Sequence, residues 1–162
     1  MGFKITKNRI NNSEKVYFIG EVGINHNGDI DLAKKIIFEA KKAGFSAVKF
    51  QKRNPEISTP NDIKSRLRET PWGQMTYLDY KYKIEFDKKE YDEIDKYCKN
   101  LEIDWFASCW DEDSLNFLLN YEPPVLKIAS ASITNKDLLI AHKDSGLPII
   151  MSTGMSTPEE IN

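Results

Sequence analysis

The sequence has only two cysteines, Cys98 and Cys109, and no CxxC pair. This excludes a disulfide framework and a cysteine zinc site, and it is typical of a reducing compartment. No apolar run approaches the roughly 18 residues of a membrane-spanning helix, and the polar first residues lack the apolar core of a signal peptide. We therefore expect a cytoplasmic protein with no membrane partner.

An excess of charge of one sign is also missing. The 162 residues carry 23 Lys+Arg against 25 Asp+Glu, a net charge of −2, without a basic block. Because nucleic-acid binders neutralise phosphates with many basic residues, we expect no nucleic-acid partner. Hydrophobic residues make up 40% of the chain and aromatic residues 11%, which is enough for the core of one folded domain.

Short apolar segments alternate with longer amphipathic ones along the chain. The apolar segments predict strands at 16–22, 46–51, 103–108, 125–130 and 148–152. Between them, the amphipathic segments predict helices at 30–43, 87–101, 113–120 and 136–144. This alternation predicts an α/β fold of parallel βα units with the helices outside the sheet. Before the first unit, residues 3–6 and 9–12 predict a small β-hairpin.

Two segments depart from this alternation. Residues 52–86 contain three prolines and the aromatic residues Trp72, Tyr77, Tyr80 and Tyr82. We expect an irregular but packed functional loop there, because long loops without regular structure are usually functional. Residues 157–160 combine Thr at the N-cap, Pro at N1 and Glu at N3 of a helix, and only two residues follow. We therefore expect the sequence to stop inside an element, with five βα units of a larger barrel.

Two lysines lie inside otherwise apolar strands, Lys49 in the second and Lys127 in the fourth. In parallel sheets ligands bind beyond the carboxyl ends of the strands, so two converging ammonium groups there predict a site for a phosphate or carboxylate. Alternation places Gln51 on the same face as Lys49. The hydroxyl donors expected at this site are Ser108, Ser130 and Ser152. The alternative is that each lysine pairs with a carboxylate such as Glu21, or reaches solvent.

Four further residues have chemistry of their own. Glu21, at the end of the first strand, is a candidate general base, and the alternative is a structural ion pair with Lys49. His26 lies in a glycine-bounded turn, where a hydrogen-bonding role is expected rather than direct chemistry. Cys109 is expected to pack in the core, and no role is assigned to His142.

Five motifs, in this order, carry a resemblance to a known family: FIGEVGINHNGDIDLAKKII, AVKFQ, FASCWDEDS, VLKIAS and PIIMSTGMST. Together they resemble the N-acetylneuraminate synthase family, which condenses phosphoenolpyruvate with an N-acyl sugar such as N-acetylmannosamine to give nonulosonic acids. The resemblance implies a (β/α)8 TIM barrel followed by an antifreeze-like domain, and a homodimer. Residues 1–15 would then be a hairpin and 16–162 the first five βα repeats, with the later repeats and the second domain absent.

The resemblance also implies roles for individual residues. The family's contacts to the phosphate and carboxylate of phosphoenolpyruvate match Lys49, Lys127, Ser130 and Ser152. Glu21 matches a glutamate beside the metal and the sugar, and Gln51 matches a glutamine that faces the sugar. The triplet 108–110 reads Ser-Cys-Trp where many members have Ser-Thr-Pro, so the contact of that threonine is not carried over.

The family mechanism implies a divalent metal, Mn²⁺ or Mg²⁺, which polarises the aldehyde of the open-chain sugar. Its histidine ligands lie on later strands and are expected beyond residue 162. The choice of acceptor sugar is expected to lie in the aromatic stretch 72–82.

Two other hypotheses stay open beside this one. The first is a Schiff-base aldolase that uses Lys127 or Lys49 as its nucleophile, because a desolvated lysine in a barrel suits that chemistry. The second is a non-catalytic fragment or binding module. For residues 1–162 alone we expect no measurable condensation.

Overall fold

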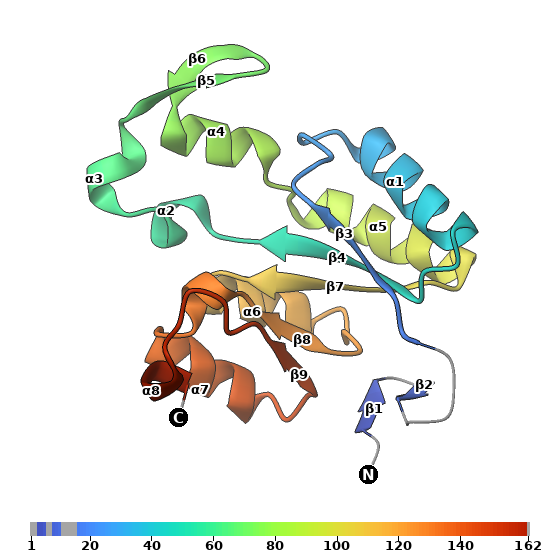
Figure 1. The fold of residues 1–162 in the computed structure, drawn as a ribbon. Coiled ribbons are helices and arrows are strands. Elements are labelled where there is room, and N and C mark those ends of the chain that lie inside the picture. The colour runs from blue at the N-terminus through green and yellow to red at the C-terminus, as the bar shows by residue number, and fades with distance from the viewer. Residues whose placement is uncertain (1–2, 6–7, 11–15, 162) are drawn as a thin grey trace.

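The computed structural model describes residues 3–5, 8–10 and 16–161. A five-stranded sheet in the order β3-β4-β7-β8-β9 forms its centre, and every pairing between these strands is parallel (Figure 1). The strands are β3 (Ile19–Gly23), β4 (Ala47–Lys52), β7 (Asp104–Cys109), β8 (Leu126–Ile128) and β9 (Ile149–Met151). Because sequential strands are parallel neighbours, each connection crosses over the sheet, and a helix lies in each one. The predicted α/β fold is therefore confirmed.

Four helices cover one face of this sheet. They are α1 (Ile30–Lys42), α5 (Lys88–Leu101), α6 (Glu112–Leu119) and α7 (Lys136–Asp144). Figure 1 shows α1 beside α5, and α6 beside α7. The predicted starts of α5 and α7 are confirmed to within one residue: Asp87 and Glu90 form a reciprocal capping box at α5, and Asn135 caps α7. The short α8 (Pro158–Ile161) also begins after Thr157 as predicted.

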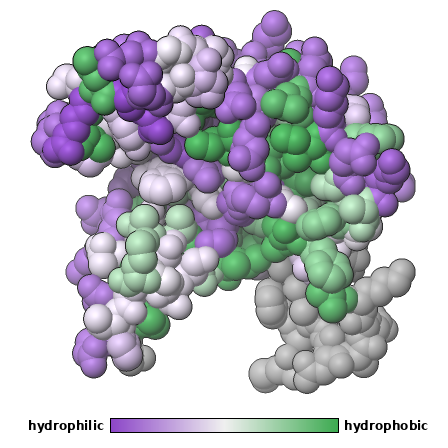
Figure 2. Space-filling model, turned by 45° about the horizontal axis from the view of Figure 1, so that its top comes forward, coloured by the Kyte–Doolittle hydropathy of each residue, from purple (hydrophilic) through white to green (hydrophobic). Residues whose placement is uncertain are grey.

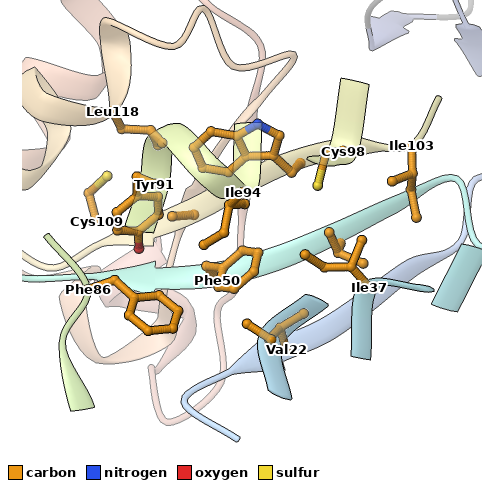
Figure 3. Close-up of a cluster of buried hydrophobic side chains, with 14 of the residues drawn as sticks. Val22, Ile37, Phe50, Phe86, Tyr91, Ile94, Cys98, Ile103, Cys109 and Leu118 are labelled. Atoms are coloured by element: carbon orange, nitrogen blue, oxygen red, sulfur yellow. The ribbon is translucent and has the colours of Figure 1, made fainter. Parts of the chain in front are cut away.

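The two faces of the sheet differ because side chains alternate along each strand. Val48 and Phe50 point toward the helices, where Phe50 packs among Val22, Ile37 and Ile94 (Figure 3). On the other face, Ala47 forms a smaller cluster with Phe106 and Val125. The same alternation places Lys49 and Gln51 above Ala47 on this second face, toward the carboxyl ends of the strands.

Residues 52–86 are not irregular, so that prediction is wrong. They form the elements α2 (Pro55–Ser58), α3 (Asn61–Lys64), β5 (Leu67–Thr70), β6 (Gly73–Thr76) and α4 (Tyr77–Ile84). β5 and β6 make a two-stranded antiparallel hairpin. We call residues 53–86 the excursion, and Figure 1 shows it projecting beyond the carboxyl end of β4. Its elements are too short to produce a periodic sequence signal, and local caps such as Asn54 and Thr76 define them instead.

The predicted N-terminal hairpin is confirmed where the chain is described. β1 (Phe3–Ile5) pairs antiparallel with β2 (Asn8–Ile10). Residues 6, 11 and 12, which the prediction included, lie outside the described residues. Three strands are shorter than predicted. β3 begins only at Ile19, β9 spans only Ile149–Met151, and β8 ends at Ile128 because residues 130–132 form the 3-10 helix η1 (Ser130–Ser132).

The edges of the sheet are exposed. β3 and β9 are the two edge strands. Val16 and Phe18, just before β3, are more than half exposed, and Met151 of β9 is also exposed. Figure 2 shows hydrophobic residues exposed between hydrophilic ones on the right of this face. In the described part of the chain, no helix has the length and apolar character that crossing a membrane requires.

Candidate active site

A cavity of about 340 Å³ opens at the carboxyl ends of the strands, on the face that the four large helices do not cover. The structure brings to it all seven residues that the sequence nominated: Glu21, Lys49, Gln51, Ser108, Lys127, Ser130 and Ser152. They come from the five neighbouring strands of the sheet or from positions within two residues of a strand end. The parallel arrangement explains the convergence, because it places every carboxyl end at the same edge.

Lys49 is held by three acceptors. Its Nζ lies 2.7 Å from Oε2 of Glu21, and it donates to Oγ of Ser108 at 3.1 Å and to the carbonyl of Phe50 at 3.3 Å. The strand register explains the ion pair, because Glu21 of β3 stands directly beside Lys49 of β4. The lysine side chain is only 11% exposed, whereas that of Glu21 is 50% exposed. The structural ion pair is therefore present, and Glu21 still faces the solvent of the cavity.

Lys127 lies two strands further along the sheet. Its Nζ donates to Oγ of Ser152 at 2.7 Å and to the carbonyl of Ile128 at 2.5 Å. Burial lowers the pKa of Lys127, the ammonium of Lys49 lowers it further, and Glu21 opposes both effects. The two ammonium groups therefore lie within electrostatic reach of each other, and one carboxylate, Glu21, acts on both. This excess of positive charge favours binding of an anion in the cavity.

Gly23 and Gln51 also line the cavity. Gly23 has a φ of +57°, and a Cβ at this position would approach Oε1 of Glu21 to 2.8 Å. A larger residue would therefore displace the carboxylate. The side-chain amide oxygen of Gln51 accepts a hydrogen bond from Nη2 of Arg53. The backbone carbonyl of Gln51 accepts one from the Tyr91 hydroxyl at 3.1 Å. These contacts fix the backbone and the amide of Gln51 at the mouth of the cavity.

The sequence did not nominate Asn25 and Trp110, which also line the cavity. Both stand just after a strand, Asn25 two residues after the end of β3 and Trp110 directly after β7. A position just after a strand was the signal in the sequence that could have identified these two residues. The backbone N–H of Trp110 donates to the carbonyl of Lys52 at 3.1 Å, and the guanidinium of Arg53 lies 4.9 Å from the centre of the indole.

The remaining candidates have structural surroundings. His26 is buried, its ring stacks on Phe86 at a centroid distance of 4.0 Å, and its Nδ1 accepts from the N–H of Gly28 at 3.1 Å. This is the predicted hydrogen-bonding role in a turn. Cys109 is buried in the core as predicted, and burial raises the pKa of its thiol well above the ordinary value. His142 of α7 is also fully buried.

Among residues 16–161 and the two described N-terminal strands, no three His, Cys, Asp or Glu side chains are grouped so that they could hold a metal ion. Glu21 is the one carboxylate among the described residues that line the cavity, and Lys49 already pairs with it. The residues present here therefore do not make a metal centre.

Comparison with known proteins connects this geometry to a family. A model described as the NeuB family matches residues 36–162. The chain is 39% identical over 150 residues to the N-acetylneuraminate-9-phosphate synthase of Drosophila melanogaster, covering 91% of this chain and 40% of the relative. It is 32% identical over 148 residues to the N,N'-diacetyllegionaminic acid synthase of Legionella pneumophila, covering 90% and 41%.

A solved structure shares the fold. The N-acetylneuraminic acid (sialic acid) synthetase of Leptospira borgpetersenii, in complex with citrate, matches with a TM-score of 0.86 at 32% identity. This match covers 99% of the present chain and 52% of that one. The chain thus spans about two-fifths of the two curated relatives and about half of the solved chain.

Proposed function

The chain belongs to the NeuB family, and on that basis we propose that the protein condenses phosphoenolpyruvate with an N-acyl hexosamine such as N-acetylmannosamine. The product would be a nonulosonic acid, the class that the names of the sialic and legionaminic acid synthases describe. One observation carries the proposal: Lys49, Lys127 and the strand-end serines converge on one cavity.

The reaction balances with water as third reactant. The methylene carbon of phosphoenolpyruvate attacks the aldehyde carbon of the open-chain sugar and forms the new carbon–carbon bond. Water adds to the resulting cationic carbon, and phosphate leaves with cleavage of the carbon–oxygen bond. The sugar aldehyde oxygen takes up a proton, and the former enol carbon becomes the keto group of the product.

The chain's own residues supply charge and position. Phosphoenolpyruvate carries a phosphate and a carboxylate, and Lys49 and Lys127 supply two cations that would hold them throughout the reaction. Ser130 and Ser152 would donate to the phosphate. Glu21 faces the cavity beside Lys49, where its carboxylate would orient the attacking water or a sugar hydroxyl.

Several wider features belong to the same proposal. The five parallel repeats would be part of a (β/α)8 barrel, in which the catalytic site lies at the carboxyl ends of the strands. A divalent metal, Mn²⁺ or Mg²⁺, would be held by residues outside this chain, and the active protein would be a homodimer. We also place the protein in the cytoplasm, which its two free, buried cysteines support.

The test is turnover of the full-length protein with phosphoenolpyruvate and an N-acyl hexosamine, measured as release of phosphate and as product mass. We expect one nonulosonic acid for each phosphate released. Borohydride treatment with substrate present distinguishes the aldolase hypothesis, because it would trap a Schiff base on Lys127 or Lys49 as a covalent adduct. Such an adduct, or phosphate release without a nine-carbon product, would refute the proposed condensation.

A further inference from the structure

The guanidinium of Arg53 lies between the excursion and the cavity. Arg53 directly follows β4 and is only 5% exposed. Nη2 of its guanidinium donates a hydrogen bond to the side-chain oxygen of Gln51, and its Cζ lies 4.9 Å from the ring centre of Trp110. Gln51 and Trp110 line the cavity, whereas Arg53 is not among the described residues that do. Any effect of Arg53 on a bound substrate therefore passes through these neighbours.

Glu85, at the end of the excursion, holds Arg53 in place. Oε2 of Glu85 lies 3.5 Å from Nε of Arg53, and Oε1 accepts a hydrogen bond from the backbone N–H of Arg53 at 3.1 Å. The two side chains are only 9% and 5% exposed. Because the carboxylate of Glu85 and the indole of Trp110 both restrict the planar guanidinium, it presents its N–H groups to Gln51 in a fixed direction.

The chemistry of Arg53 decides which end of the Gln51 amide faces the cavity. A guanidinium carries only donors, so the end of the amide that faces it has to be the oxygen. The amide nitrogen Nε2 therefore points the other way. It lies 3.5 Å from the position that a Cβ of Gly23 would occupy, at the lining of the cavity. Within the described part of the chain Nε2 makes no hydrogen bond, so its donors are available to a ligand.

This donor stands beside an acceptor. Oε1 of Glu21 lies 2.8 Å from the same Cβ position of Gly23, so Nε2 of Gln51 and the Glu21 carboxylate flank one point of the cavity. A hydroxyl group matches such a pair, because it accepts a hydrogen bond from the amide and donates one to the carboxylate. A phosphate or carboxylate at this point would be repelled by the charge of Glu21. This part of the cavity therefore suits a neutral hydroxyl.

The same point lies on the opposite side of Lys49 from Lys127. The strand order is β3-β4-β7-β8-β9, with Gly23 on β3, Lys49 on β4 and Lys127 on β8. The proposed phosphoenolpyruvate site between the two lysines therefore extends from β4 toward β8, whereas the Gln51 amide faces β3. Of the two substrates proposed above, only the sugar carries hydroxyl groups.

We propose that Arg53 is a positioning residue for the acceptor sugar: it orients the amide of Gln51 so that Nε2, together with the carboxylate of Glu21, binds a hydroxyl of that sugar. The proposal rests on the proposed function and adds to it a residue outside the cavity that controls sugar affinity. Without the guanidinium, the two ends of the amide could exchange places. The amide oxygen would then face the carboxylate of Glu21 and could not donate to the sugar.

The test uses the variants Arg53→Lys and Gln51→Met, alone and combined, in the full-length protein with N-acetylmannosamine as acceptor. Lysine keeps a positive charge beside Glu85 but lacks the planar fork that contacts Glu85 and Gln51 together. The matched control is Arg66→Gln, which removes an exposed arginine of the same excursion that pairs with Asp62 at 3.0 Å. The readouts are kcat and the KM for each substrate, with urea unfolding to show that every variant folds.

Arg53→Lys should raise the KM for the sugar about threefold to tenfold, the range for one hydrogen bond between neutral groups, and leave the KM for phosphoenolpyruvate unchanged. Gln51→Met should raise the KM for the sugar at least as much. Adding Arg53→Lys to Gln51→Met should have no further effect, because Arg53 acts through Gln51. Arg66→Gln should change neither KM.

Three results would overturn the proposal. The first is an unchanged KM for the sugar in Arg53→Lys. The second is a double variant in which the effects of Arg53→Lys and Gln51→Met multiply, because Arg53 would then act independently of Gln51 through the fold. The third is a rise in the KM for phosphoenolpyruvate alone, which would assign the amide of Gln51 to that substrate.

Failure of the proposed function is separable from failure of this proposal. If N-acetylmannosamine is not converted, the proposed condensation fails for this acceptor, and the orientation of the amide is tested without substrate. Nitrogen-15 relaxation of the glutamine side chains measures it, with the Gln51 signal identified by its loss in Gln51→Met. We expect a rigid Gln51 amide in the wild type and a mobile one in Arg53→Lys. Equal mobility in the two proteins would refute positioning by Arg53.

Discussion

Burial of His26 makes the stability of this fold depend on pH. The ring is 3% exposed and stacks on Phe86. Burial lowers the pKa of His26 from 6.5 to about 4, although the carbonyl of Gly23 and the charge of Asp29 both favour the protonated ring. The folded protein therefore holds the ring neutral at a pH where the unfolded chain protonates it.

The sign and size of the effect follow from linkage. Because the pKa is lower in the folded state, the contribution of His26 is fully present above pH 6.5 and is lost as pH falls toward 4. The pKa difference of about 2.5 between the folded and unfolded states, at about 1.4 kcal/mol for each pKa unit, gives at most about 3–4 kcal/mol, and most of it is lost by pH 4.5. This is a large share of the stability of an ordinary domain.

The assay is urea unfolding at pH 7.5 and at pH 4.5, for the wild type and for His26→Asn. The asparagine side chain keeps an acceptor for the N–H of Gly28 but does not titrate. Carboxylates titrate in both proteins, so the comparison isolates the histidine. We expect the wild type to lose about 2–3 kcal/mol more than His26→Asn between these pH values. Equal losses in the two proteins would refute the account of the buried neutral ring.

Three further changes test the site and its supporting turn. Lys127→Met should raise KM for phosphoenolpyruvate at least about tenfold in steady-state assays of the full-length protein, because it removes a cation from the anion site; an unchanged KM would remove Lys127 from that site. Glu21→Gln should lower kcat without raising KM for phosphoenolpyruvate, since it takes away a negative charge beside Lys49, and a raised KM would contradict this. Gly28→Ala should lower the free energy of unfolding, measured in urea, by more than about 1 kcal/mol, because φ of Gly28 is +73° and the new Cβ would lie 2.3 Å from the carbonyl oxygen of Lys83. An unchanged free energy of unfolding would argue against that close approach.

The features that the sequence predicted well depend on local or periodic signals. The start of α5 at Asp87 and the limits of α7 follow from residues within one turn of the helix ends. The convergence of Glu21, Lys49 and Lys127 follows from parallel topology alone, because each residue stands near the carboxyl end of its strand. Their chemical roles do not follow from topology and stay predictions.

The features that the sequence did not predict depend on contacts between separate elements. Arg68, Lys81 and Tyr80 meet only because the β5–β6 hairpin folds back onto α4. Arg53 reaches Trp110 because β4 and β7 are adjacent strands. Neither contact leaves a pattern along the chain, so an excursion of short elements appeared irregular in the sequence.

The two lysines of the cavity are not equivalent, although the sequence treats them alike. An ammonium has three N–H donors, and those of Lys49 have three acceptors in Glu21, Ser108 and the carbonyl of Phe50. Lys127 has two acceptors among the described residues, the hydroxyl of Ser152 and the carbonyl of Ile128. Its third N–H is therefore available to an incoming anion without any rearrangement.

This difference predicts an order of effects. Lys127 would contact the anion directly on binding, whereas Lys49 has to exchange one of its partners, and its weakest contact is the carbonyl of Phe50 at 3.3 Å. Lys127→Met should therefore act mainly on phosphoenolpyruvate affinity. Lys49→Met should also free the carboxylate of Glu21, and so change kcat as well as KM. Equal changes of kcat and KM in the two variants would show that the lysines share one role, contrary to their hydrogen bonding.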